Sequence, residues 1–156
     1  MTHSATTGEK SKQDSIVKPH RLSHGTLICA DMQRTRRFYE EFLGLEVVRH
    51  APSAMMFRLS TGIHVVCVEC GPSKLWGMHV LHHWGIDVGT EKEVDDAYQS
   101  ALEHKDEYGI RAIMKPVTQH GAYSFYLQDL DQNWWEIQCS PLDHEAYFAR
   151  GDVVSS

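Results

Sequence analysis

The chain has 156 residues, 42% of them hydrophobic and 23% charged, which is enough for one globular domain with a core of its own. Its net charge of -6 argues against a nucleic acid or an anionic membrane as partner, and no apolar run is long enough to span a bilayer. Four scattered cysteines and a polar N-terminus without a signal-peptide core predict a cytoplasmic protein with reduced thiols.

The chain begins with residues 1–19, a polar segment without periodicity that predicts a disordered tail. A single domain is expected over residues 20–140, followed by a C-terminal tail at 141–156 with a short helix. Within the domain the same order of elements is expected twice. The first copy, residues 20–70, has a strand, a helix capped by Asp31 and ended by Gly44, and three more strands; the strands are expected at 22–29, 45–49, 55–59 and 63–69.

The second copy, residues 79–140, repeats this order after a connector rich in glycine and proline. Its helix begins with a capping box at Thr90 and carries an apolar stripe at helical spacing. The strands of this copy are expected at 80–88, 110–114, 120–128 and 134–138. The predicted fold class is therefore α+β, with two paired βαβββ modules that form a curved mixed sheet around a cleft.

The last two strands are predicted to form a hairpin whose turn, 129–133, is supplied with Asp and Asn. With the turn centred on Asp131, Tyr126 lies opposite Glu136, and directly opposed residues share one face of a sheet. Alternation along the first arm adds His120 to that face. A faint likeness of the turn to a calcium loop lacks the rest of that pattern, so turn chemistry is the preferred interpretation.

The two copies open with equivalent strands that each carry a histidine, His24 and His83, on the face away from the helix. With Glu136 they form two imidazoles and one carboxylate, a ligand set that binds a divalent metal and leaves positions open for substrate. Any one of the three could merely bond to backbone or solvent. Their three equivalent strand positions favour a metal site in the cleft between the modules.

Three further residues are candidate catalytic groups. His64 and His120 could transfer protons near neutral pH, and the hydroxyl of Tyr126 could donate to an anionic intermediate. Each could also be an ordinary cleft or surface residue. Trp134 shares the Glu136 face by parity and could floor an aromatic pocket, although tryptophans more often belong to a core or an interface.

The chain resembles the vicinal oxygen chelate superfamily, also called the glyoxalase/bleomycin resistance/extradiol dioxygenase superfamily, over about residues 20–140. The resemblance implies paired βαβββ modules, one metal ion and a homodimer. It rests on the opening strand, on the end of the first helix, on the strand of His83 and on the hairpin; the corresponding segments are 24–31, 37–45, 83–88 and 126–136.

Within that superfamily the chain is most similar to type I extradiol dioxygenases, of which it would be a single-domain member. The similarity implies Fe(II) held by His24, His83 and Glu136, with Mn(II), Zn(II), Ni(II) and Co(II) as alternatives. It implies a catechol-type aromatic substrate cleaved with O2, proton transfer by His64 or His120, and a hydrogen bond from Tyr126 to the substrate.

Two other functions stay open at this point. One is a metal-dependent lyase, isomerase or epimerase of the glyoxalase kind, in which the metal acts as a Lewis acid. The other is a non-catalytic small-molecule binder, whose relatives generally lack the metal triad. A thiol-transferring antibiotic-resistance enzyme is also possible, but the sequence has no dense Lys/Arg cluster to bind a phosphonate, because Arg58 and Lys115 are isolated.

Overall fold

The computed structural model describes residues 16–17, 21–60, 62–141 and 144–150. The chain divides into two units, Ser23–Ser140 and the two terminal segments together, and the fold described here is that of the first. The predicted tail at 1–19 lies outside the described residues except for Ile16 and Val17, and the C-terminal segment contains helix α4, His144–Arg150. No described helix is both long and apolar enough to cross a membrane.

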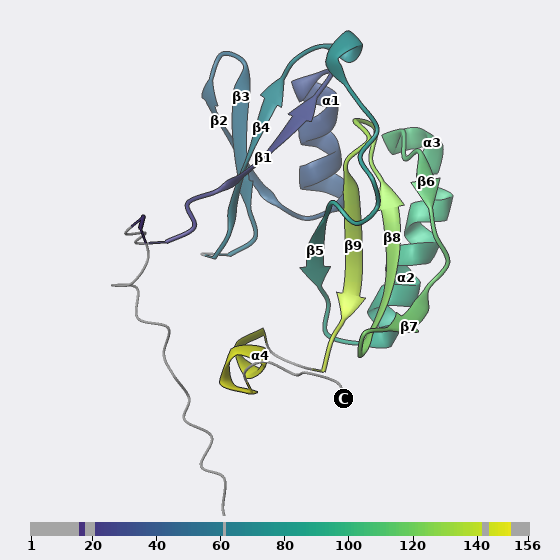
Figure 1. Ribbon diagram of the computed structural model, residues 1–156. Helices are drawn as coiled ribbons and strands as arrows, with labels where there is room; N and C mark the ends of the chain where they lie inside the picture. The colour runs from purple at the N-terminus through teal and green to yellow at the C-terminus, as the bar shows by residue number, and fades with distance from the viewer. Residues whose placement is uncertain (1–15, 18–20, 61, 142–143, 151–156) are drawn as a thin grey trace, which may run out of the picture. The chain divides into compact units, whose positions relative to one another are not determined.

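The first module follows the predicted order, with a sheet of four strands arranged β1-β4-β3-β2 (Figure 1). Strand β1 runs parallel to β4, and the other neighbours are antiparallel. The elements are β1 Gly25–Cys29, α1 Met32–Arg37, a π-helix Phe38–Phe42, β2 Glu46–Ala51, β3 Ala54–Arg58 and β4 His64–Glu69.

The helix of this module starts and stops where predicted but changes form on the way. The side chain of Asp31 accepts a hydrogen bond from Arg34 N at 3.0 Å and caps α1. The second half widens into a π-helix, in which Leu43 N donates to Phe38 O five residues earlier at 3.1 Å. Gly44 then turns the chain with a positive φ of 70°.

The second module has a sheet of five strands, with β5-β9-β8-β6 as its main order and β7 also paired to β8. After the short 3-10 helix Pro72–Lys74, the elements are β5 His83–Asp87, α2 Glu91–Glu103, α3 Lys105–Tyr108, β6 Ala112–Ile113, β7 Val117–Gln119, β8 Ala122–Gln128 and β9 Trp134–Cys139. The α+β class and the paired modules are therefore confirmed, with one mixed sheet in each module.

The predicted hairpin register is confirmed, but its first arm is shorter than expected. Tyr126 pairs with Glu136 as the parity argument required. The arm starts at Ala122, because His120 and Gly121, with φ of 51° and 84°, form a two-residue turn between β7 and β8. The placement of His120 on the Glu136 face was therefore wrong, since alternation along a strand does not extend into a turn.

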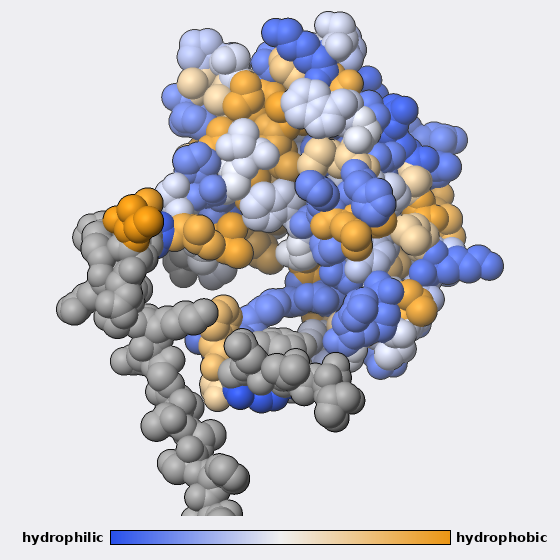
Figure 2. Space-filling model, viewed as in Figure 1, coloured by the Kyte–Doolittle hydropathy of each residue, from blue (hydrophilic) through white to orange (hydrophobic). Residues whose placement is uncertain are grey.

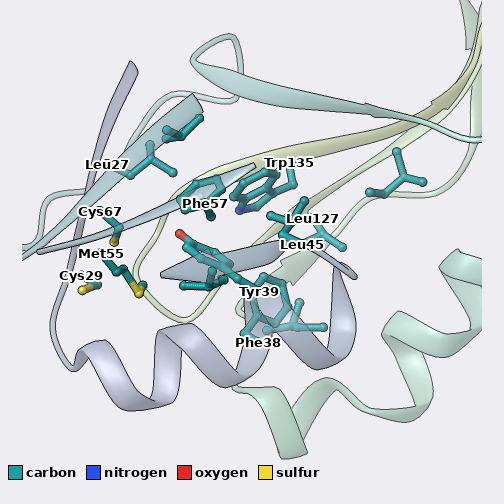
Figure 3. Close-up of a cluster of buried hydrophobic side chains, with 14 of the residues drawn as sticks. Leu27, Cys29, Phe38, Tyr39, Leu45, Met55, Phe57, Cys67, Leu127 and Trp135 are labelled. Carbon is teal, nitrogen blue, oxygen red and sulfur yellow. The ribbon is translucent and has the colours of Figure 1, made fainter. Parts of the chain in front are cut away.

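One hydrophobic core joins the two modules, and Tyr39 lies at its centre (Figure 3). The ring of this fully buried residue is 4.6 Å from that of Phe57 in the first sheet and 5.4 Å from that of Trp135 in the second, between centroids. Aromatic pairs at such spacings add to the burial energy, so the two sheets are stabilised as one packed body.

The β8–β9 turn reinforces this union with polar contacts. Asp131 Oδ1 accepts from Ala30 N at 2.8 Å, and Asn133 Nδ2 donates to Ile28 O at 3.2 Å. The hydroxyl of Thr35, in α1, donates to the other carboxylate oxygen of Asp131. A turn of the second module thus satisfies backbone groups at the end of β1, in the first module.

Gly25→Ala is expected to lower the free energy of unfolding by about 1–3 kcal/mol, as overpacked core substitutions do. A Cβ at this position would lie 2.1 Å from Cη2 of Trp84, so the indole or β1 must move. Gly62→Ala is the control, since nothing lies within 4 Å of its Cβ and its φ is not positive. Urea unfolding of both variants tests this, and an unchanged Gly25→Ala would show that β1 does not pack on Trp84.

Candidate metal centre

The second sheet has a polar face on the side away from the core. Strand alternation places His83, Glu136 and Tyr126 on it, while Trp84 and Ile86 pack against the core as predicted. Register sets Gly85 beside Glu136 and Glu136 beside Tyr126.

His83 and Glu136 are brought together by this arrangement. Nε2 of His83 lies 3.3 Å from Oε2 of Glu136, and the two side chains are 25% and 13% exposed. On the other side of the ring, Nδ1 lies 2.7 Å from the carbonyl oxygen of Val80, which accepts only, so Nδ1 carries a proton. Nε2 therefore has two possible states. It either carries a second proton and donates to the carboxylate, or it presents a lone pair, and then a cation between Nε2 and the carboxylate oxygen would stabilise the pair.

The spacing of these two atoms suits two ligands of one metal ion. Ligand atoms that each lie about 2.1 Å from an ion are about 3.0–3.4 Å apart when their bonds meet at a right or tetrahedral angle. The fixed Nδ1 proton is also the usual condition of a metal-binding histidine, whose other nitrogen donates to a carbonyl or carboxylate. The pair is chemically fit to hold a divalent metal.

Tyr126 completes this cluster. Its ring packs edge-on against His83 with 5.0 Å between centroids, and its hydroxyl oxygen accepts from Nε2 of Gln119 at 3.0 Å. Partial burial, and then the hydrogen bond to Glu136, raise the pKa of Tyr126 to about 12. The side chain is therefore a neutral phenol with a proton to donate at physiological pH.

Gln119 is a site residue that the sequence argument missed. It belongs to β7, a three-residue strand that was not predicted, and it reaches Tyr126 because β7 pairs with β8. Pro116 just before β7 and the His120-Gly121 turn after it were the available signals of a separate short strand.

His24 and His64 belong to the first sheet. Strands β1 and β4 are parallel with Gly25 beside Val65, so the residues just before this pair, His24 and His64, lie near each other at the start of the two strands. His24 is exposed, and its Nδ1 is 2.8 Å from the hydroxyl oxygen of Ser23. That these two histidines lie near each other was not predicted from the sequence.

The three expected ligands do not meet within the described part of one chain. No three His, Cys, Asp or Glu side chains among the described residues are placed to share a metal ion. The reason lies in the packing: Gly25 contacts Trp84, which is on the core face of the second sheet, whereas His83 points from the opposite face. The beginning of β1 therefore lies on the wrong side of that sheet to bring its own His24 to Glu136.

The remaining predicted residues are placed as follows. His120 is exposed in its turn and has no hydrogen bond or ion pair to another described residue. Trp134 lies beside His83 in register, on the Glu136 face as predicted, and its Nε1 donates to Met78 O at 2.9 Å. All four cysteines are free thiols, as expected.

A comparison with protein-family models matches residues 21–137 to the glyoxalase/bleomycin resistance protein/dioxygenase superfamily. The chain belongs to this superfamily. A comparison with curated proteins finds no match.

Solved structures share the superfamily fold. A mutant of the fosfomycin resistance protein FosX from Listeria monocytogenes, in complex with Mn(II) and 1S,2S-dihydroxypropylphosphonic acid, has a TM-score of 0.62 and 20% identity, over 80% of this chain and 93% of that one. A possible glyoxalase from Bacillus cereus has a TM-score of 0.62 and 23% identity, over 78% and 100%. FosX from Mesorhizobium loti has a TM-score of 0.57 and 20% identity, over 83% and 99%.

Proposed function

We propose that this protein is an enzyme that depends on a divalent metal held by His83, Glu136 and His24. The observation that carries the proposal is the pair at 3.3 Å, in which the proton on Nδ1 of His83 leaves Nε2 to face a carboxylate oxygen. Two imidazoles and one carboxylate leave coordination positions free for a substrate. Membership of a superfamily that includes metalloenzymes supports the same conclusion.

His24 is proposed to come from a second copy of the chain. The outer face of the first sheet, whose strand β1 follows His24 directly, is apolar around its centre and in part exposed (Figure 2). The side chains involved include Val48, 60% exposed, with Met56, Val66 and Val68. A symmetric dimer that lays this face against the polar face of the other copy's second sheet would cover it and complete two identical sites.

The chain's own groups then have distinct tasks. Tyr126 can donate its proton to Glu136 or to an anionic oxygen of the substrate, and Gln119 fixes the direction of the phenol. A bound divalent metal would supply Lewis acidity to substrate oxygens. The role predicted for His120 finds no supporting contact among the described residues and stays a prediction.

The preferred reaction class is Lewis-acid chemistry on a small substrate with two neighbouring oxygen atoms, as in glyoxalase-like lyases and isomerases. Apart from His83, no described imidazole contacts Tyr126 or Glu136, so the cluster itself supplies a phenol and a carboxylate for proton transfer. The FosX complex is a superfamily example with Mn(II) and a small dihydroxy compound. Mn(II), Zn(II), Ni(II) and Co(II) are the metals expected for this class.

The second candidate is the Fe(II)-dependent ring cleavage of a catechol-type substrate with O2. The position of His64 beside His24 favours it, because a second copy that brings the one histidine into the site also brings the other. An imidazole near the metal would serve as the acid and base that ring cleavage requires.

The two candidates are separated by purifying the protein without oxygen, measuring its metal content and assaying two panels. Catechols are tested in an oxygen electrode; the thiol adduct of methylglyoxal and fosfomycin are tested for product by NMR. We expect Mn(II), Zn(II), Ni(II) or Co(II) and turnover without oxygen uptake. Iron with catechol-dependent uptake would establish the dioxygenase instead, and a protein that binds none of these metals would refute both.

A further inference from the structure

A cavity lies on the other side of the second sheet from His83 and Glu136. Its volume is about 360 Å³, at the small end of the range of ligand pockets, roughly 300–1,000 Å³. Its floor is apolar and consists of residues from the core face of the second sheet and from the end of the π-helix: Ile86, Val88, Ile137, Phe42 and Leu43.

The cavity lies where the cover that helix α2 gives to this sheet ends. Helix α2 packs over β8 and β9, whereas β5 lies at the sheet edge beyond β9. On the core face of β5, Trp84 contacts Gly25, and Ile86, like Val88 just after the strand, is only partly buried. The π-helix ends just there, and π-helical segments are frequent at functional sites.

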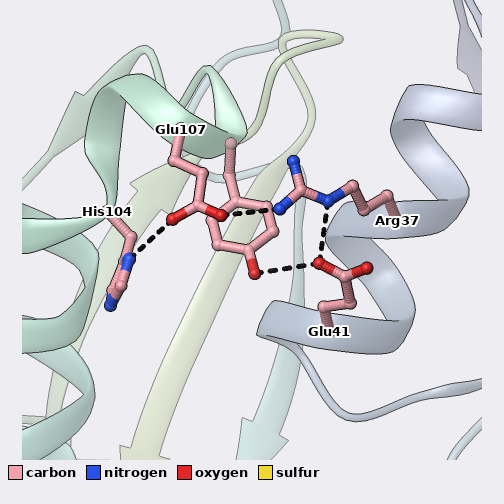
Figure 4. A network of polar contacts seen from close by, with 5 residues as sticks. Arg37, Glu41, His104 and Glu107 are labelled. Carbon is pink, nitrogen blue, oxygen red and sulfur yellow. Dashed lines mark hydrogen bonds and ion pairs between the residues drawn. The ribbon is translucent and has the colours of Figure 1, made fainter.

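A charged network forms the rim (Figure 4). The guanidinium of Arg37 bridges two carboxylates, at 2.8 Å from Oε2 of Glu41 and 2.6 Å from Oε1 of Glu107. The hydroxyl of Tyr108 donates to the same Oε2 of Glu41 at 3.2 Å, and Nδ1 of His104 lies 2.8 Å from Oε2 of Glu107.

This network carries a net negative charge. Hydrogen bonds from His104 and Arg37 lower the pKa of Glu107, which keeps that carboxyl ionised. Two carboxylates against one guanidinium leave a net charge of -1 when His104 is neutral. Oε1 of Glu41, a residue that lines the cavity, accepts no hydrogen bond from any described residue, so it can accept one from a ligand.

We propose that this cavity binds a small organic cation, with an aromatic or aliphatic body on Ile86, Val88 and Ile137 and an ammonium group at Glu41. The apolar floor provides contact area, and the carboxylate selects for charge. An anion of the same shape would place its charge at the carboxylate of Glu41 and be repelled. The site is independent of the metal centre, because the second sheet separates the two.

The test uses the intact protein and three ligands of one shape: tryptamine as the cation, tryptophol as the neutral isostere and indole-3-acetate as the anion. Binding is measured by calorimetry and located by amide shifts in NMR spectra. We expect affinity to fall in that order, with shifts centred on Ala97 and Ser100, and to be unaffected by EDTA. Equal affinity for all three, no binding, or shifts centred on Tyr126 would overturn the proposal.

Variants make the assignment specific. Glu41→Gln should weaken tryptamine binding about tenfold and leave tryptophol binding nearly unchanged, as expected for loss of a charge-assisted hydrogen bond. Glu40→Gln is the matched control, because it removes an equivalent ion pair to Arg36 but lies outside the cavity. Ala97→Leu should fill the cavity and abolish binding of both ligands, while Gln99→Leu, exposed on the same helix, should not. If Ala97→Leu still binds tryptamine with wild-type affinity, the cavity is not the site.

Discussion

Replacing His83 by alanine is expected to abolish stoichiometric metal binding while leaving the protein folded. Even substitutions of residues that only support a ligand weaken metal binding by about 10–100-fold, so the loss of a ligand should exceed about 100-fold. The side chain is 25% exposed and packs on a polar face, so its removal creates no cavity in the core. Elemental analysis after dialysis against dilute metal measures the effect, and circular dichroism checks the fold.

His82→Ala is the matched control for this experiment. His82 precedes His83 directly but lies outside β5 and is exposed, so its variant should keep the wild-type metal content. If His83→Ala retained its metal as well, the proposed ligand set would be wrong.

The same variant also tests the shared site. His24→Ala and His83→Ala should each lack metal, but a heterodimer of the two has one intact site, built from His83 and Glu136 of one copy and His24 of the other. After random subunit exchange the mixture should regain about a quarter of the wild-type metal content per chain, or somewhat more if the defective pairs rearrange. A mixture that stays without metal would place His24 outside the site or the whole site within one chain.

The parts of this site that sequence predicts are those set by local geometry. Alternation of side chains and a turn centred on Asp131 were enough to pair Tyr126 with Glu136 and to prefer His83 over His82. The same rule failed for His120, because a two-residue turn interrupts the strand and alternation holds only within a strand.

The relation of His24 to His83 lies beyond local geometry. His83 lies on the polar face of β5, whereas His24 precedes β1, and the packing of the two sheets depends on contacts such as Gly25 against Trp84. The two modules could be recognised from the order of their elements. The hydrophobic periodicity of the sequence does not indicate how the two sheets pack against each other.

In the secondary structure, too, some features follow from local sequence and others do not. Capping by Asp31 and Thr90 was predicted from residue type and is confirmed, since each side chain accepts from a backbone N–H three residues on. The π-helix at Phe38–Phe42 was not predicted, because its apolar spacing resembles that of an ordinary helix. The expected strand at 110–114 shortened to Ala112–Ile113, with a separate strand after Pro116.

The second large effect is expected at Asp129, the buried carboxylate of the β8–β9 turn. Its Oδ1 accepts from the backbone N–H groups of Asp131 and Asn133, both at 2.9 Å, and its Oδ2 accepts from Nε1 of Trp135 at 3.1 Å. Asp129→Ala leaves these donors buried without an acceptor, at about 1–3 kcal/mol for each. Because the buried charge is removed as well, we expect a net loss of about 3 kcal/mol or more in the free energy of unfolding at pH 7.

The pH dependence of that loss identifies the carboxylate as its source. Burial raises the pKa of Asp129 to about 6, against the pull of its hydrogen bonds. A carboxyl with a raised folded pKa contributes stability that is fully present below its unfolded pKa and is lost as pH rises through about 6. The gap between wild type and Asp129→Ala should therefore widen between pH 7 and pH 4, by up to about 3 kcal/mol.

Urea unfolding of both proteins across this pH range measures the gap, and taking the difference cancels the titration of the other carboxylates. Asp96→Ala, which loses only an exposed ion pair with Lys92, should differ little from wild type and show no such trend. A gap for Asp129→Ala that is constant or narrows toward pH 4 would mean that the turn is held by its backbone and by Asp131 alone. A widening gap would show that the turn is held by the hydrogen bonds of the Asp129 carboxyl group, while the negative charge on that group opposes folding.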